Sequence, residues 1–306
     1  MTGQQTSPST GIIGVIPQKI FGLHVDRDIL FSNHKRVYKK GIEKRQRKLI
    51  IKVPFLKPFI RDNERVLCVT KGHSPITLFE KLGIGWLFVY LKRSLFVFTD
   101  QRIFHIPTTP VYKYRQSISE IPYSSCRSIR IKGRALVIEY KKTGFTEKFF
   151  SLAGKEKKKI SALLNNISLE GNKAVGSYRT HLCPRCAARQ LENEPTCRGC
   201  ELKFKTFTMA ALLAILFPGG GYYYVHQYFL GAIFTLWELL LIGIAFTMYN
   251  DYAQGGLQGA LLWLIVAVLL LVFEKSIAVL HAGIFIQDLI PASGDVAFRS
   301  VPSNSN

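Results

Sequence analysis

The amino-acid sequence has few acidic residues: 20 Asp and Glu stand against 41 Lys and Arg, for a net charge of +21. The shortage is confined to one part of the chain. Residues 1–205 hold 39 basic and 15 acidic residues, whereas residues 206–306 hold 2 and 5. The basic part predicts an anionic partner, which is nucleic acid, an acidic protein or an acidic membrane surface.

Cysteine is also scarce. The chain has six, of which four form two CxxC pairs, while Cys68 and Cys126 stand alone. This pattern excludes a disulfide-dense secreted domain and suits a reducing compartment with a metal site. The first residues, MTGQQTSPST, lack the charged and apolar segments of an export signal. We therefore expect internal apolar segments to drive any membrane insertion.

Catalytic motifs are missing too. The sequence has no P-loop, GxSxG, HExxH or dinucleotide fingerprint. The histidines of the basic part, His24, His34, His73 and His105, are scattered along the sequence. We predict a protein that is not an enzyme, with no catalytic and no cofactor-binding residues.

Two long apolar segments lie near the C-terminus. Tyr228–Tyr249 has 22 residues with one charge, Glu238, and Gly255–Phe273 has 19 residues with none. Each reaches the ~20 residues that a transmembrane helix needs. A third apolar segment, 206–217, is short and ends at PGGG. It predicts a re-entrant or interfacial helix, or a broken first span.

The segment LFPGGGYYYVHQYFLGA (216–232) resembles the turn of TM2-type hairpins, in which a glycine-rich turn precedes an aromatic patch. The resemblance implies a helical hairpin. Because Lys and Arg favour the cytoplasmic side, we expect the basic residues before 206 to be cytoplasmic. With two spans the C-terminus is cytoplasmic as well, and with three it is external. The connection at 250–256 has no Lys or Arg, which favours two.

A carboxylate within a span is costly to bury in lipid. Glu238 has two interpretations: a protonated side chain hydrogen-bonded inside the bundle, or an ion or proton site with His226 or His281. The second would make the protein a subunit of a transporter or channel.

The basic part begins with residues 1–60, which we expect to be partly disordered, with nine Lys and Arg and one acid in 34–52. Residues 61–168 predict one α+β domain. Strand patterns occur at 65–71, in a hairpin at 94–106, and three times in 126–152. A helix with one apolar face follows; this face consists of Ile160, Leu163, Leu164 and Ile167.

The segments FVFTDQRIFHIP and SEIPYSSCRSI, followed by a C-terminal amphipathic helix, resemble bacterial PH and GRAM-like domains. The resemblance implies a PH-like antiparallel β-barrel or sandwich that binds lipid or protein. The stretch 74–92 departs from it and predicts a core or interfacial insertion. Lys155, Lys157, Lys158 and Lys159 predict either a solvated face or a contact with lipid phosphates.

The two CxxC pairs are the strongest local pattern. They consist of Cys183, Cys186, Cys197 and Cys200. Four thiolates at this spacing predict a tetrahedral structural Zn²⁺ site, and the segment resembles a short zinc ribbon. A dithiol redox site and an Fe–S centre are the alternatives. His181 is expected to be an ordinary neighbour. Nucleic-acid binding by the ribbon is not expected, because no aromatic residue lies between the pairs.

Together these patterns predict an α+β protein with five segments. These are the N-terminal segment 1–60, the PH-like domain 61–168, the zinc ribbon 176–205, the transmembrane region 206–290 and the tail 291–306. The expected function is a non-enzymatic, multi-pass membrane-anchored adaptor or scaffold. Its expected partners are an anionic membrane surface and another protein. The alternatives are a transporter or channel subunit and a membrane-tethered nucleic-acid-binding protein.

Overall fold

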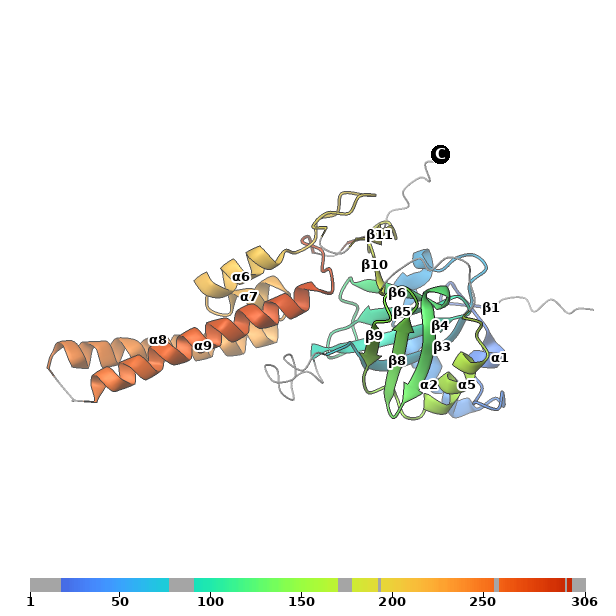
Figure 1. The fold of residues 1–306 in the computed structure, drawn as a ribbon, viewed down its shortest axis with the longest axis horizontal. Helices are drawn as coiled ribbons and strands as arrows, with labels where there is room; N and C mark the ends of the chain where they lie inside the picture. Colours follow the sequence, from blue (N-terminus) through green and yellow to red (C-terminus); the bar gives the residue numbers. More distant parts are fainter. Residues whose placement is uncertain are drawn as a thin grey trace, which may run out of the picture.

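The structure is a computed structural model, and it describes residues 18–76, 91–169, 178–191, 194–255, 259–294 and 296–298. Figure 1 shows a body built of β-sheets at one end of the molecule and a long helical hairpin that projects from it. Most of the predicted insertion at 74–92 lies outside the described residues.

The body is built on a large sheet with the strand order β1-β2-β3-β4-β5-β6-β10-β11. Its strands are β1 Gln18–Ile20, β2 Leu23–Val25, β3 Val66–His73, β4 Arg93–Thr99, β5 Arg102–Pro107, β6 Ile118–Pro122, β10 Thr180–Leu182 and β11 Arg189–Gln190. All pairs are antiparallel except β2 with β3. The strand and hairpin predicted at 65–71 and 94–106 are confirmed.

A second sheet has three antiparallel strands, which are β7 Cys126–Lys132, β8 Ala135–Tyr140 and β9 Thr146–Phe149. Its turns contain Gly133 and Gly144, both with positive φ. His73 and Phe150 exchange two backbone hydrogen bonds, of 2.8 and 3.2 Å, and so join the two sheets at one corner. Over the described residues the sheets do not close into a barrel.

Both faces of the large sheet are covered, which explains why β4 and β5 are buried along nearly their whole length. One face packs against the small sheet and α5 (Lys157–Asn165). Ile160 and Leu164 of α5 are buried there, as the apolar pattern predicts. Lys159 is buried too, and its Nζ donates to the carbonyl of Leu30 (2.7 Å). Lys159 therefore does not belong to a solvated face.

The other face packs against residues 18–60. This segment forms α1 (Arg27–Leu30), α2 (Lys40–Ile50) and the 3₁₀ helix η1 (Pro54–Phe59). Gln46 of α2 is fully buried, and its amide group exchanges two hydrogen bonds of 2.9 Å with the backbone of Val69 in β3. The side chain thus satisfies backbone groups of β3 that lie beyond its single pairing with β2.

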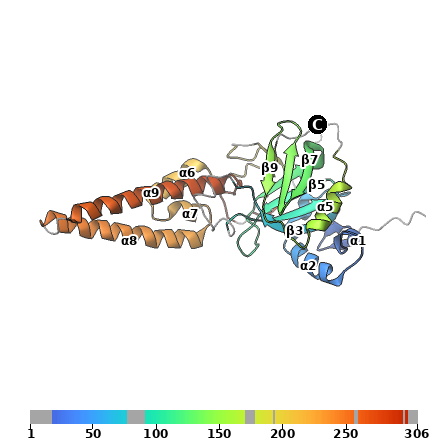
Figure 2. The ribbon, with the colours of Figure 1, turned by 60° about the horizontal axis from the view of Figure 1, so that its bottom comes forward.

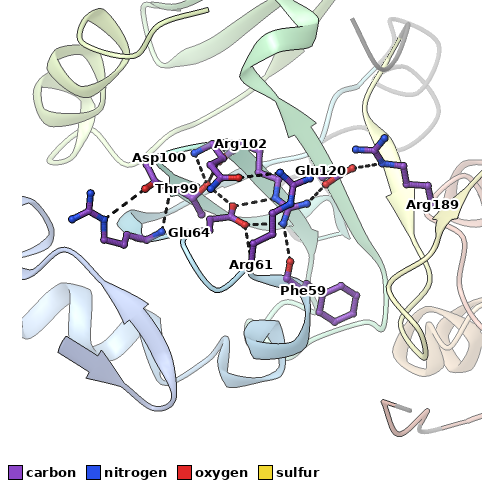
Figure 3. A network of polar contacts seen from close by, with 10 residues as sticks. Phe59, Arg61, Glu64, Thr99, Asp100, Arg102, Glu120 and Arg189 are labelled. Carbon is purple, nitrogen blue, oxygen red and sulfur yellow. Dashed lines mark hydrogen bonds and ion pairs between the residues drawn. The ribbon is translucent and has the colours of Figure 1, made fainter. Parts of the chain in front are cut away.

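A buried ion-pair network lies across the same sheet (Figure 3). Arg102 of β5 forms two bonds with Glu64, of 2.7 and 3.0 Å, and also pairs with Glu120 of β6. Glu120 in turn accepts from Arg189 of β11 at 2.8 Å. The hydroxyl of Thr99 donates a second hydrogen bond (2.7 Å) to the Glu64 oxygen that accepts from Arg102 Nε. Because the buried charges are paired and hydrogen-bonded, the network holds β11 to the centre of the body.

The C-terminal helices are α6 (Phe207–Leu216), α7 (Gly220–Tyr224), α8 (Tyr228–Ala253) and α9 (Ala260–Ile286). Helices α8 and α9 are long and apolar enough to cross a membrane. Helix α8 begins at the predicted residue and runs past Tyr249 to Ala253, whereas α9 begins at Ala260, after the predicted start at Gly255, and runs past Phe273 to Ile286. Their large apolar side chains are mostly exposed; Phe229 is 77% and Leu236 is 70% exposed. Core helices of a soluble domain would bury these surfaces.

Helix α6 has only 10 residues, about 15 Å, which is half of a hydrocarbon core of ~30 Å. The chain then breaks at Pro218 and Gly219, and α7 packs back beside α6. After α9 the chain returns to the body. Lys205 donates to Ile290 (2.9 Å), and Ala292 donates to Lys203 (2.8 Å). Both ends of the helical region therefore meet the body on one side (Figures 1 and 2).

Candidate metal centre and cationic cluster

The four predicted cysteine ligands converge in one place. The Sγ atoms of Cys183, Cys186, Cys197 and Cys200 all lie within 4.8 Å of one another. Cys183 and Cys200 are 3.5 Å apart, and Cys186 and Cys197 are 3.6 Å apart. Four sulfurs placed tetrahedrally at a Zn–S distance of about 2.3 Å are about 3.8 Å apart. The cluster therefore has the size and donor set to hold a metal ion.

The two CxxC turns have the same backbone conformation. In each turn the first cysteine donates to the carbonyl five residues later and accepts from the amide four residues later. These bonds are Cys183 to Ala188 (2.8 Å), Ala187 to Cys183 (2.9 Å), Cys197 to Leu202 (2.9 Å) and Glu201 to Cys197 (2.9 Å). Ala187 and Glu201 each adopt a left-handed φ, of 59° and 58°. The repeat places two pairs of thiols face to face.

The surroundings of the thiols act in opposite directions on their ionisation. Burial raises the pKa of Cys186 to about 11 and raises that of Cys183 further. Burial also acts to raise the pKa of Cys197, but hydrogen bonds from the amides of Gly199 and Cys200 and from Gln190 lower it to about 7. Thiols held protonated by burial ionise when a metal cation compensates their charge.

The ribbon that carries the cysteines is continuous with the large sheet. β10 pairs with β6 and places His181 opposite Ser119. The His181 ring contacts the Ser119 hydroxyl at 3.3 Å and is not part of the cysteine cluster, in line with its expected role as a neighbour. Arg189 adds the ion pair with Glu120. The cysteine cluster is therefore attached to the body through the large sheet.

A second site, which the sequence analysis missed, surrounds Tyr112. Three cations face its ring: Lys71 at 4.2 Å, Lys52 at 5.3 Å and Arg93 at 5.3 Å from the centroid. We call these residues the cationic cluster. Burial, and then the charges of Lys52 and Arg93, lower the pKa of Lys71. An anion bound here would relieve the repulsion between like charges.

The cationic cluster lies where the body meets the helical hairpin. Tyr112 belongs to the connection between β5 and β6. In the same connection Arg115 lies over the ring of Phe285 in α9 (5.3 Å), and Ser117 donates to the carbonyl of Asp288. Helix α2, which carries much of the basic segment 34–52, lies at the lower edge of the body in both views, and Lys52 follows its last residue, Ile50, by two positions (Figures 1 and 2).

Glu238 is fully buried among the C-terminal helices, and its ion-pair partner is Lys275 of α9, at 2.6 Å. This partner differs from the histidines that the sequence suggested. His226 contacts the hydroxyl of Tyr228 (2.8 Å), and His281 contacts that of Tyr222 (2.7 Å). The sequence signal was available, because Lys275 is the one lysine after residue 205.

Comparison of the chain with protein-family models, with curated proteins and with solved structures finds no match.

Proposed function

We propose that the protein is a non-enzymatic adaptor anchored in a membrane by α8 and α9, whose body binds anionic lipid headgroups through the cationic cluster. The observation that carries this proposal is the convergence of Lys52, Lys71 and Arg93 on one tyrosine ring. The same connection contacts the end of α9. The cationic cluster would therefore lie close to the lipid headgroups at the membrane surface.

The charge distribution supports an orientation with the body in the cytoplasm. Residues 1–205 carry 39 basic residues, whereas the connection between α8 and α9 has no Lys or Arg. Such asymmetry is typical of a cytoplasmic basic side. The cytoplasmic leaflet is anionic, and each Lys or Arg near it contributes ~1 kcal/mol to the attraction. The attraction would orient the anchored body and leave its other surfaces open to a partner protein.

The arrangement of the body supports a PH-like module. Strands β3 to β6 form one antiparallel layer, and β7 to β9 form a second. Helix α5 packs against the hydrophobic core between the two layers. This is the order that the sequence resemblance implies. Lys71 and Arg93 lie in β3 and β4, the first two strands of that order.

The four-cysteine donor set supports Zn²⁺ as a structural ion. All-sulfur tetrahedral sites are typical of structural zinc, and such a site has no open position for a substrate. An ion here would hold the ribbon between β6 and the returning segment 289–292. We therefore propose that the metal ion stabilises the fold and takes no part in catalysis.

The lipid proposal is tested with the full-length protein in neutral detergent. Short-chain phosphatidylserine is titrated in, and short-chain phosphatidylcholine serves as the neutral comparison. We expect binding of the anionic lipid alone, which weakens steeply as salt rises. The triple variant Lys52→Gln, Lys71→Gln, Arg93→Gln should lose about two orders of magnitude in affinity, at ~1 kcal/mol for each cation.

A matched variant removes the same charge from the exposed face of α2: Lys40→Gln, Lys44→Gln, Lys48→Gln. It should bind anionic lipid as the wild type does. Equal losses in both variants would mean that only net charge matters and would overturn the assignment of the site. A preference for RNA over anionic lipid at physiological salt would replace the lipid proposal with nucleic-acid binding.

A further inference from the structure

The break between α6 and α7 exposes backbone groups that polar side chains satisfy. The Nζ of Lys275 donates to the carbonyls of Ala214 (2.9 Å) and Phe217 (3.3 Å) at the end of α6. The amide of Gly219 donates to Glu238 Oε1 at 3.0 Å. Glu238 Oε2 lies 2.6 Å from Lys275 Nζ and completes the arrangement. One ammonium group and one carboxylate thus bridge the break and neutralise each other.

A second buried carboxyl group, that of Glu274, has no cation of its own to balance its charge within the described part of the chain. Glu274 precedes Lys275 in α9 and is only 4% exposed. Its carboxyl group lies against that of Glu238. Neither of its oxygens has a hydrogen-bond partner among the described residues. Two carboxylates therefore share one ammonium group at a buried place, and a second buried negative charge there would be costly.

The geometry points to a proton-binding site in which Glu274 carries one proton and donates it as a hydrogen bond to Glu238. A proton removes the excess charge and supplies the donor that the two acceptors lack. A metal cation fits less well, because the ammonium of Lys275 already takes the two carbonyls and the Glu238 oxygen. The proton belongs to the carboxyl pair, as in other close pairs of acids.

The other titratable group that faces the pair is Tyr222 of α7. Its hydroxyl lies 2.7 Å from Nδ1 of His281 in α9. Helix α6 has no titratable side chain. Lys275 is therefore the cation on which the charge balance depends. Loss of the proton would place a second negative charge beside the carbonyl end of α6 and weaken the contacts across the break.

This inference rests on the buried contacts among the C-terminal helices, and it does not depend on the lipid-binding proposal. It is tested by infrared spectroscopy of the full-length protein in neutral detergent at pH 7. A protonated carboxyl group gives a carbonyl band that ionised carboxylates lack and that shifts in D₂O. We expect this band in the wild type and its loss in Glu274→Gln. Asp62→Asn, which changes an exposed acid, should retain the band.

Two further variants report on the charge balance. In Lys275→Met both carboxyl groups should be protonated, so the band should roughly double. In Glu238→Gln the band should vanish, because Glu274 then ionises to pair with Lys275. Circular dichroism shows whether each variant keeps its helices. If Glu274→Gln does not fold, the wild-type band and its increase in Lys275→Met decide the question.

Three results would overturn the proposal. The first is a wild-type spectrum at pH 7 without the protonated band. The second is a band that survives in folded Glu274→Gln. The third is a band that disappears when Na⁺ or K⁺ is added at constant pH, which would show that the pair binds a metal cation.

Discussion

Gly219 shows how a single residue sets the course of the helical region. Its φ of 64° lies in the left-handed region. A Cβ atom at this position would lie 2.4 Å from Thr235 Oγ1 and 2.5 Å from the carbonyl oxygen of Gly231. Only glycine meets both conditions without a shift of the backbone. The same residue donates the backbone bond to Glu238, so the break and the buried carboxylate depend on one another.

We predict that Gly219→Ala destabilises the helical region by about 1–3 kcal/mol from backbone strain alone, with the steric contacts adding to this. The control is Gly243→Ala, because a Cβ there meets nothing within 4 Å and alanine favours a helix by up to ~1 kcal/mol. Thermal unfolding in neutral detergent should place the first variant below the wild type and the second at or above it. Equal stability of Gly219→Ala and the wild type would contradict the geometry at the break.

At the scale of elements, the ribbon is the part of the body whose order would depend most on the proposed zinc ion. Its strands are short, and its buried cluster consists of Cys183, Cys197, Leu202 and Phe204. So small a core cannot offset the entropy of ordering the segment. Structural zinc contributes about 10–16 kcal/mol in small domains. The pairing of β10 with β6 then carries this stabilisation into the large sheet.

We predict one zinc ion per chain, and its loss in Cys186→Ser. Elemental analysis by mass spectrometry measures the ion. Hydrogen exchange should show faster exchange in residues 178–191 and along β6, while α8 and α9 keep their protection. Cys126→Ser is the control, since Cys126 is a buried free cysteine outside the cluster, and it should retain the ion. Iron with a coloured chromophore in place of zinc would identify an Fe–S centre.

At the scale of the whole molecule, the described helices form a hairpin whose two ends return to one body. Residues 203–205 lead into α6 and pair with residues 290–292, which follow α9. The last residues of α8 and the first residues of α9 lie at the end of the hairpin away from the body (Figure 2). If α8 and α9 cross a membrane, the segments before α6 and after α9 lie on one side of it.

We predict that a reporter fused after Asn306 lies in the cytoplasm and that one inserted at Gln254 lies outside. Protease or alkylating reagent applied to intact cells distinguishes the two. The backbone pairing of residues 203–205 with 290–292 requires the two chain segments to share a compartment. A reporter after Asn306 that is reached from outside would show that the region 206–227 also spans.

Local sequence patterns were sufficient to predict part of this structure. The apolar lengths of 228–249 and 255–273 predict α8 and α9, because a helix that spans lipid must satisfy its own backbone and expose apolar side chains. The spacing of the four cysteines predicts one cluster, since a CxxC turn already places two thiols together. The hairpin of β4 and β5 follows from two adjacent apolar strands.

Only the tertiary structure decided which distant residues meet. Gln46 bonds to β3, 23 residues away; Glu238 pairs with Lys275, 37 residues away. Tyr112 contacts cations from β3, from β4 and from the turn that follows α2. No local periodicity records such contacts, because they arise when packed elements bring buried polar groups within reach of one another. The sequence by itself thus determined the two long apolar helices and the four-cysteine cluster that could hold a metal ion. The packing of the chain determined the proposed lipid site, the ion pair at the helix break and the proposed proton site beside it.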